Sequence, residues 1–262
     1  MTLNSKNAII YGAGGSIGSA VATTFTEQGA RVFLAGRTRQ PLDAVAADIT
    51  AAGGQAEVAV LDALDEHAVD EHARSVAESA GGIDVSFNLV SGGDLQGIPL
   101  ADMTTADFTR PVLTRLTANF ITARAAARHM AKQGSGVILA LDSGSAYGSP
   151  MMGGTGPADA ATDMLVRNLA AELGPQGVRV LGIWTAGLPE TLSPEKIAAH
   201  SGGPVMDEAA FGGLLQHLDG MRMTRRSPRL AEVAATAAFL ASDLAGAITG
   251  TFVNVTSGMF PS

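Results

Sequence analysis

Short apolar runs rich in β-branched residues alternate with longer helix-type segments along nearly the whole chain. The runs lie at residues 7–11, 31–35, 56–62, 84–90, 136–142, 178–184 and 250–256. One of the intervening helical segments, about 40–52, ends at Gly53-Gly54, a typical helix stop. Strands that alternate with helices pair in parallel through right-handed crossovers. The sequence therefore predicts an α/β fold, a doubly wound parallel sheet of about seven strands with helices on both faces.

Composition narrows the classes of protein that remain. The chain has 262 residues, 46% of them apolar, which is enough for one sizeable folded core. A net charge of −8 argues against a nucleic-acid partner, and the lack of cysteine excludes disulfides and thiolate chemistry. No apolar run reaches the ~18 residues of a membrane span, and the N-terminus does not resemble a signal peptide. We expect a cytoplasmic protein without a membrane partner.

The five histidines have no spacing typical of metal ligands, and no metal site is predicted. His67 and His72 lie among acidic residues, so we expect both on a solvated helix face.

Residues 187–228 interrupt the alternation of strands and helices. They are rich in Gly, Pro and Met and end in the charged stretch RMTRRSPR. In an open α/β sheet, an insertion after the sixth strand lies at the carboxyl edge, where ligands bind. We interpret it as a mobile substrate lid within a single domain covering residues 1–262. A surface excursion without a role is the alternative.

A glycine-rich loop, YGAGGSIGSA at residues 11–20, follows the first strand and opens a helix. Glycines there allow a tight turn and let the helix N-terminus approach a pyrophosphate. A strand before the loop and a helix after it favour dinucleotide binding over a merely flexible loop. The residues predicted to hold the phosphates are Gly12, Gly14, Gly15, Ser16, Ile17 and Gly18.

The end of the second strand indicates which cofactor is bound. An acidic residue about 20 positions after the glycine loop would bind the ribose 2′-hydroxyl of NAD(H). Gly36 stands there instead, followed by Arg37, Thr38 and Arg39. Guanidinium groups at this place suit a 2′-phosphate. The sequence therefore favours NADP(H) over NAD(H).

Taken in order, these motifs resemble those of the short-chain dehydrogenase/reductase family along nearly the whole chain. The glycine loop, the segments VLDALD, DVSFNLVSG, ILALDSGSA and GIWTAGLPET, and the C-terminal stretch RSPRLAEVAATAAFLASDLAGAITGTFVNVTSG carry the resemblance. It implies a Rossmann-like fold and a small-molecule substrate. It further implies that Ser143 is the catalytic serine. The other residues that it places at the cofactor are Asp62 and Ala63 at the adenine, Asn88 at the central strand, and Gly187, Leu188 and Thr191 beside the nicotinamide.

The departures from the family pattern fall on its catalytic residues. The family joins an Asn, a Ser, a Tyr and a Lys in its active site. At the Tyr and Lys positions this chain has Thr155 and Asp159, and at the Asn position it has Arg115. A threonine hydroxyl is far too weak an acid to replace a tyrosine at neutral pH.

Several groups are candidates for the missing acid. Tyr147 lies four residues after Ser143 and is an alternative donor, or else only a packed loop aromatic. If Asp142 and Asp159 are buried together, one of them can be driven to hold a proton. Arg115 restores a positive charge but cannot shuttle a proton. Water is the remaining source, and the sequence leaves the choice between Tyr147 and water open.

Three functions remain open on the sequence. The first, which we favour, is an NADP(H)-dependent oxidoreductase acting on a carbonyl, an alcohol or a related electrophile. The second is a nucleotide-binding relative without catalysis, acting as a sensor or partner subunit. The third is a lyase or isomerase in the same cleft. The Ala-rich helices at 104–132 and 155–174, which form a dimer interface in the resembled family, predict a homodimer or homotetramer.

Overall fold

The computed structural model describes residues 1–260 and contains one sheet of seven parallel strands. The strand order is β3-β2-β1-β4-β5-β6-β7, so the predicted fold class is confirmed. Three strands have the predicted bounds, and β7 is shorter because it pairs only with the last three residues of β6. The strands are β1 Asn7–Tyr11, β2 Arg31–Gly36, β3 Gln55–Val60, β4 Val85–Asn88, β5 Gly136–Asp142, β6 Val178–Trp184 and β7 Phe252–Asn254.

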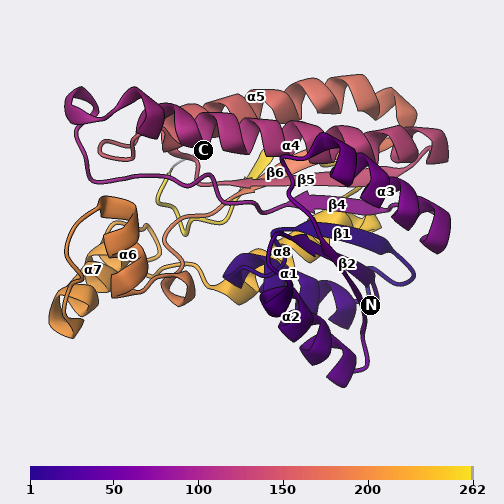
Figure 1. Ribbon diagram of the computed structural model, residues 1–262, viewed down its shortest axis with the longest axis horizontal. Helices are drawn as coiled ribbons and strands as arrows, with labels where there is room; N and C mark the ends of the chain where they lie inside the picture. Colours follow the sequence, from indigo (N-terminus) through magenta and orange to yellow (C-terminus); the bar gives the residue numbers. More distant parts are fainter. Residues whose placement is uncertain (261–262) are drawn as a thin grey trace.

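Helices cover both faces of the sheet (Figure 1). Successive side chains of a strand point to opposite faces, so Ala8 and Ile10 join one buried cluster while Ile9 joins the other. The first cluster lies under α1 Ser16–Glu27, α2 Arg39–Ala51 and α8 Leu230–Ala241. The second lies under α3 Glu66–Ala80, α4 Thr105–Gln133 and α5 Thr155–Leu173. Two further helices, α6 Pro194–Ser201 and α7 Glu208–Gly220, lie together at one end of the molecule (Figure 1).

Close packing brings the start of α5 against α4. The inner faces of both helices carry alanines such as Ala118, Ala126 and Ala158, each at most 1% exposed. At Gly154, which caps α5, an added Cβ would lie 2.0 Å from the carbonyl oxygen of Phe108. Only a glycine allows this approach, which brings the first turn of α5 against the first two turns of α4.

The strand order reverses between β1 and β4, and the loops after β1, β4, β5 and β6 gather at the carboxyl edge of the sheet. In open α/β sheets a ligand binds in the crevice at such a switch point. The topology therefore predicts that a ligand site is bordered by four segments: the glycine loop, residues 89–99, residues 143–154 and residues 185–193.

No helix within residues 1–260 is both long enough and apolar enough to cross a membrane.

The two histidines of α3 differ in exposure. His67 is exposed as expected, but His72 is half-buried, with its ring edge-on to that of Tyr11 at a centroid distance of 6.4 Å. The expectation of a solvated His72 was wrong, because α3 turns that residue toward the sheet.

Candidate active site

The glycine loop forms the turn between β1 and α1 that a phosphate group requires. Gly12 has a φ of +78°, and a Cβ at Gly18 would lie 2.4 Å from the Gly12 carbonyl oxygen. The helix α1 begins at Ser16, followed by Ile17. Its capping residue, Gly15, has no side chain that could accept from the first amides, and the first turn contains no acidic residue. The first amide N–H groups of α1 are therefore available to an anion. The geometry fits a dinucleotide pyrophosphate.

The loop after β2 carries cations at the surface. Arg37, Thr38 and Arg39 are all exposed. Arg39 has only a long ion pair with Asp43, at 3.8 Å, and Arg37 has no carboxylate within ion-pair distance among residues 1–260. Gly36 has no side chain beside them. This loop therefore presents exposed cations to solvent.

Asp62 and Ala63 follow β3, and Asn88 ends β4. The Asp62 carboxylate accepts a hydrogen bond from the Leu64 amide at 3.0 Å, and Ala63 is buried. The buried Asn88 amide donates to Asn119 Oδ1 in α4 at 2.9 Å, and its own oxygen accepts from the Val90 amide at 3.2 Å. Asn88 therefore joins β4 to α4.

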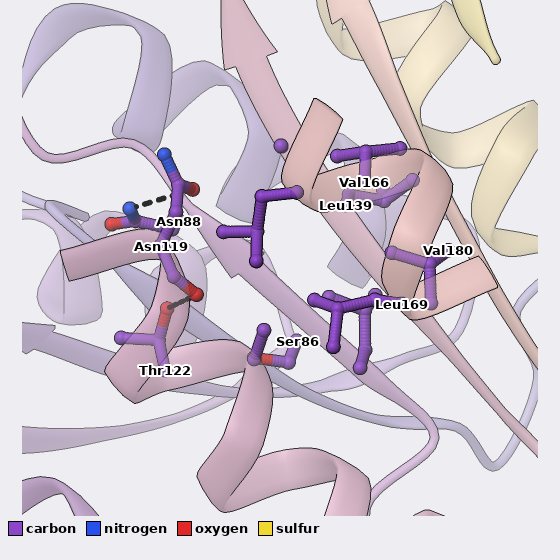
Figure 2. Close-up of a pocket in the computed structure, with 12 residues that line it drawn as sticks. Ser86, Asn88, Asn119, Thr122, Leu139, Val166, Leu169 and Val180 are labelled. Carbon is purple, nitrogen blue, oxygen red and sulfur yellow. Dashed lines mark hydrogen bonds between the residues drawn. The ribbon is translucent and has the colours of Figure 1, made fainter. Parts of the chain in front are cut away.

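Beside that pair lies a cavity of about 10 Å³, roughly room for one water molecule. Ser86, Asn88, Asn119 and Thr122 are its polar lining, and aliphatic side chains of β5, β6 and α5 close it (Figure 2). It is too small for a substrate.

The turn after β6 lies at the same edge of the sheet. Gly187 has a φ of +57°, Leu188 is 2% exposed, and the Thr191 hydroxyl donates to the Leu188 carbonyl oxygen at 2.9 Å. Thr191 closes the short helix η4 Pro189–Thr191.

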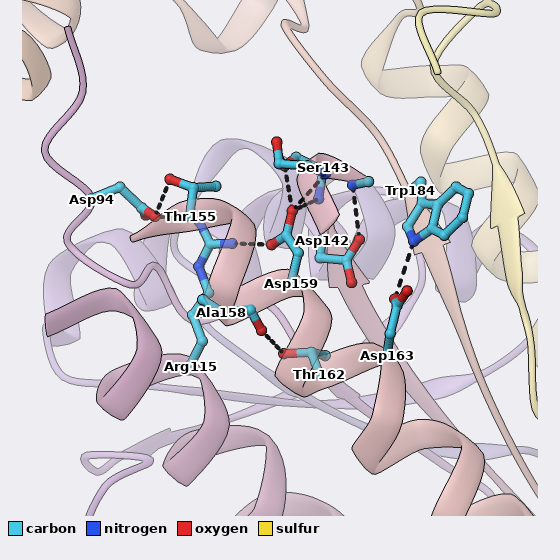
Figure 3. A network of polar contacts seen from close by, with 12 residues as sticks. Asp94, Arg115, Asp142, Ser143, Thr155, Ala158, Asp159, Thr162, Asp163 and Trp184 are labelled. Atoms are coloured by element: carbon cyan, nitrogen blue, oxygen red, sulfur yellow. Dashed lines mark hydrogen bonds and ion pairs between the residues drawn. The ribbon is translucent and has the colours of Figure 1, made fainter. Parts of the chain in front are cut away.

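One face of α5 carries the polar residues of the candidate active site. Thr155, Asp159 and Asp163 follow one another at four-residue intervals and are all buried. The side chain of Asp159 is 0% exposed. Its Oδ2 accepts hydrogen bonds from the Ser143 hydroxyl at 2.5 Å, the Ser143 amide at 3.2 Å and the Ser145 amide at 3.0 Å (Figure 3). The sequence candidates Ser143 and Asp159 are thus in direct contact.

Arg115 of α4 completes the contacts of Asp159. Its Nη1 pairs with Asp159 Oδ1 at 2.7 Å and its Nη2 with Asp94 Oδ2 at 2.7 Å. The Thr155 hydroxyl donates to the other oxygen of Asp94 at 2.8 Å. Arg115, Thr155 and Asp159 therefore belong to one network that holds both carboxylates. A threonine committed in this way is not free to serve as a donor to substrate.

Asp142, the last residue of β5, lies between Asp159 and Asp163 (Figure 3). One of its oxygens accepts from the Gly144 amide at 3.0 Å, while Oδ2 is buried and has no hydrogen-bond donor among residues 1–260. Burial, followed by the charges of Asp159 and Asp163, raises the pKa of Asp142 to about 9. Burial also raises the pKa of Asp159, against the opposing effects of Arg115 and of the donors from Ser143 and Ser145. Burial and the neighbouring carboxylates therefore favour the neutral form of Asp142.

No tyrosine or lysine side chain within residues 1–260 makes a hydrogen bond to this network. Tyr147, in the short helix η2 Ser145–Tyr147, is 62% exposed and packs edge-on against the Trp184 ring at a centroid distance of 5.3 Å. Tyr11 is buried beside His72, and burial raises the pKa of its hydroxyl. The three lysines lie before β1, at the end of α4 and in α6: Lys6, Lys132 and Lys196.

Sequence reasoning missed three members of the network. Asp94 lies in the glycine-rich loop after β4, where no periodicity marks a residue. Ser145 contributes a buried hydroxyl 2.7 Å from the Ser143 hydroxyl, and Asp163 accepts from the Trp184 indole at 3.4 Å. The four-residue spacing of Asp159 and Asp163 was a usable signal for the last of these.

A doubly wound sheet with a phosphate-type glycine loop at its switch point defines a dinucleotide-binding α/β protein. The buried hydroxyl and carboxyl groups at the ends of β5 and α5 add groups that can move a proton beside the bound ligand.

Comparison with known proteins agrees with this class. The family model described as enoyl-(acyl carrier protein) reductase matches residues 12–260. The 7alpha-hydroxysteroid dehydrogenase of Escherichia coli is 30% identical over 98% of this chain and 95% of its own length. The L-rhamnose 1-dehydrogenase (NAD(P)+) of Azotobacter vinelandii is 32% identical over 99% of this chain and 98% of its own. The crystal structure of an NAD+-bound xylitol dehydrogenase, 26% identical, superposes with a TM-score of 0.88 over 98% of this chain and 100% of that one.

The chain therefore belongs to the short-chain dehydrogenase/reductase family, and it is an oxidoreductase of that type.

We predict that Asp142→Asn stabilises the protein increasingly as the pH rises. In the unfolded chain an aspartate loses its proton near pH 4, whereas Asp142 in the folded protein keeps it up to about pH 9. Between these values the folded state binds more protons, so the stability of the wild type falls as the pH increases. Asparagine keeps the acceptor for the Gly144 amide and has no charge. The advantage should grow by at least about 1 kcal/mol from pH 5 to pH 8, since one pKa unit corresponds to roughly 1.4 kcal/mol.

Urea unfolding at both pH values measures this difference. Asp48→Asn, on the exposed face of α2, is the matched control and should leave the pH dependence unchanged. An advantage of Asp142→Asn that is the same at both pH values would refute a neutral carboxyl at this position.

Proposed function

We propose that the protein is an NADP(H)-dependent oxidoreductase that interconverts an alcohol and a carbonyl compound, or a related electrophile such as an imine. We further propose that its active site is non-standard, with Thr155 and Asp159 in place of the family's Tyr and Lys. The observation that carries the proposal is the 2.5 Å hydrogen bond from the Ser143 hydroxyl to the buried carboxylate of Asp159. A hydroxyl bonded to a carboxylate that can take up a proton is a usable acid–base group.

The preference for NADP(H) rests on the end of β2. Two of the comparison proteins bear names with NAD(P)+ and NAD+, so the comparisons leave the choice between cofactors open. Gly36 offers no carboxylate to a ribose 2′-hydroxyl, and Arg37 is exposed without an ion pair among the described residues. Arg37, Thr38 and Arg39 would hold the 2′-phosphate. The glycine loop would hold the pyrophosphate, Asp62 and Ala63 would border the adenine, and Gly187, Leu188 and Thr191 would border the nicotinamide.

When bound, a nicotinamide supplies or accepts the hydride. The protein's own residues handle the proton. In the oxidative direction, Ser143 Oγ accepts the proton of the substrate hydroxyl while its own proton passes to Asp159 Oδ2. In the reductive direction both protons move back, and the substrate oxygen receives one. Arg115 holds Asp159 in position but, as a permanently charged group, transfers no proton.

A nucleotide-binding relative without catalysis is the second candidate. It is favoured by the completeness of the network, because the hydroxyls of Ser143 and Thr155 and the carboxylates of Asp94 and Asp159 already have partners within the protein. Activity then requires that the substrate hydroxyl replace Ser145 as the partner of Ser143.

We also propose that residues 187–228, which contain α6 and α7, form a substrate lid. The Gln96 amide donates to the His200 carbonyl oxygen at the end of α6 at 2.7 Å, which links this segment to the loop after β4.

A homodimer or homotetramer through α4 and α5 is a further proposal. It is supported by apolar side chains on these helices that are between 44% and 63% exposed: Leu113, Phe120 and Met164.

We expect Arg37→Ala to weaken NADPH binding by about tenfold or more, the scale of a lost charge-assisted contact, and to leave NADH binding nearly unchanged. Isothermal titration with both cofactors measures this, and NADH is the internal control. Equal losses for the two cofactors would assign Arg37 a structural role and refute its contact with the 2′-phosphate.

We expect Ser143→Ala and Asp159→Asn each to lower kcat by about 10²-fold, the usual scale for a positioned acid–base partner, and Thr155→Val to change it little. Carbonyl reduction needs the protonated acid, so its rate should fall as the pH rises through the raised pKa of Asp159. Steady-state kinetics with a panel of carbonyls and imines measures both.

Tyr147→Phe separates the remaining donors. Turnover lost in Tyr147→Phe but kept in Asp159→Asn would make the tyrosine the acid. Turnover that survives both variants with an unchanged pH profile would leave water as the donor. NADPH binding without oxidation by any compound of the panel would support the relative without catalysis.

Light scattering at micromolar concentration should give the mass of a dimer or a tetramer. Leu113→Glu on α4 should lower that mass, because it buries a charge at the proposed interface. Val205→Glu, at a similarly exposed residue of the proposed lid, is the matched control and should leave the mass unchanged. A monomer mass for the wild type would refute the oligomer.

A further inference from the structure

The largest fully buried side chain of the described residues belongs to Arg222, which is 1% exposed. Arginine is almost never buried to this extent without an anionic partner. Within residues 1–260, however, no carboxylate lies within ion-pair distance of the Arg222 guanidinium. Three main-chain carbonyl oxygens surround it instead. Its Nη1 donates to Leu218, and its Nη2 donates to Ala186 at 2.8 Å and to Gly187 at 3.3 Å.

The accepting carbonyls join two distant parts of the chain. Ala186 and Gly187 form the turn directly after β6, whereas Leu218 lies in the last turn of α7. An added Cβ at Gly187 would lie 2.7 Å from Arg222 Nη2, and the φ of +57° at Gly187 also favours glycine. The guanidinium group therefore packs against the turn so closely that a side chain at Gly187 would collide with it.

The turn leads back to the phosphate-binding helix. Leu188 is buried in the cluster against which Ile17 of α1 also packs, and η4 lies beside α1. In a doubly wound sheet the two halves of a dinucleotide bind on either side of the switch point. The glycine loop and Arg37 belong to the half built on β1 and β2. The turn after β6 belongs to the other half, where the nicotinamide would lie.

The segment around Arg222 is held in place independently. Asp219 of α7 accepts hydrogen bonds from the Ser227 amide at 2.7 Å and from the Ser227 hydroxyl at 2.6 Å. These bonds connect the two ends of the loop that contains Arg222. Arg225, only three residues from Arg222, is exposed, and its guanidinium donates to the carbonyl oxygen of Gly220, the last residue of α7.

We propose that Arg222 is a positioning residue that fixes the turn at residues 186–188 for the nicotinamide half of the cofactor and ties that turn to α7. The proposal rests on the NADP(H) binding proposed above. Loss of the guanidinium frees the turn but leaves the glycine loop and the loop after β2 unchanged. It therefore weakens the binding of the whole cofactor and spares its adenosine half.

The experiment compares two probes on the purified full-length protein by isothermal titration. NADPH reports on both halves of the site, and adenosine 2′,5′-bisphosphate, which lacks the nicotinamide, reports on one. Arg222→Met should weaken NADPH by about tenfold or more, since roughly 1.4 kcal/mol of lost contact corresponds to tenfold. It should change the affinity for the bisphosphate by less than about twofold. Arg222→Lys should recover part of the NADPH affinity, because an ammonium can still donate to one or two of the carbonyls.

Two of these comparisons guard against a simple folding defect. Arg225→Met, on the exposed neighbour, should leave both affinities unchanged. Arg222→Lys keeps a cation at the buried position, so the two probes can still be compared if Arg222→Met does not fold, and its smaller loss should again be confined to NADPH.

Equal losses of both probes in the Arg222 variants, or no loss of either, would overturn the role of Arg222 while leaving the proposed cofactor intact. A wild type that binds neither probe would refute the proposed cofactor and this inference with it.

Discussion

A carboxylate that no water reaches needs donors from the protein, and Asp159 imposes this need on the carboxyl edge of the sheet. Asp159 Oδ2 accepts from the Ser143 and Ser145 amides in the loop after β5, and Oδ1 accepts from Arg115 of α4. Asp159 thereby connects this loop to α4. The close approach of α4 and α5 at Gly154 brings the donors within reach. The geometry of the candidate active site thus follows from satisfying one buried charge.

Arg115 carries a single positive charge among four carboxyl groups, of Asp94, Asp142, Asp159 and Asp163. Arg115 pairs with Asp94 and Asp159, so Asp142 and Asp163 have no buried cation at ion-pair distance among the described residues. Within residues 1–260, the one cation at ion-pair distance from Asp142 or Asp163 is Arg167, 3.9 Å from Asp163 and half-exposed. Because Asp142 is buried beside two other carboxyl groups, its neutral form is favoured, and its pKa is raised to about 9. Perturbed carboxyl groups of this kind gather at functional sites, because the same burial that reduces stability adjusts acidity for proton transfer.

Two arginines, Arg37 after β2 and Arg222 after α7, illustrate how burial changes the role of one residue type. Arg37 stands in solvent, and its charge acts only when an anion arrives. Arg222 is enclosed, and its donors are already used by carbonyl oxygens of the chain itself. The first is suited to recognising a ligand, the second to keeping the backbone in one conformation.

The sequence by itself determined the parallel sheet, the bounds of β1, β5 and β6, and the glycine loop. These follow from local rules, namely the two-residue period of buried strands and the dihedral freedom of glycine. It also brought Ser143, Thr155, Asp159 and Arg115 under consideration as a group. Only the tertiary structure decided that Asp94 links Arg115 to Thr155, that Tyr147 packs on Trp184, and that Arg222, within a stretch resembling a charged surface, is buried. These contacts join residues tens of positions apart, and burial and hydrogen-bond partners arise only once helices and strands have packed.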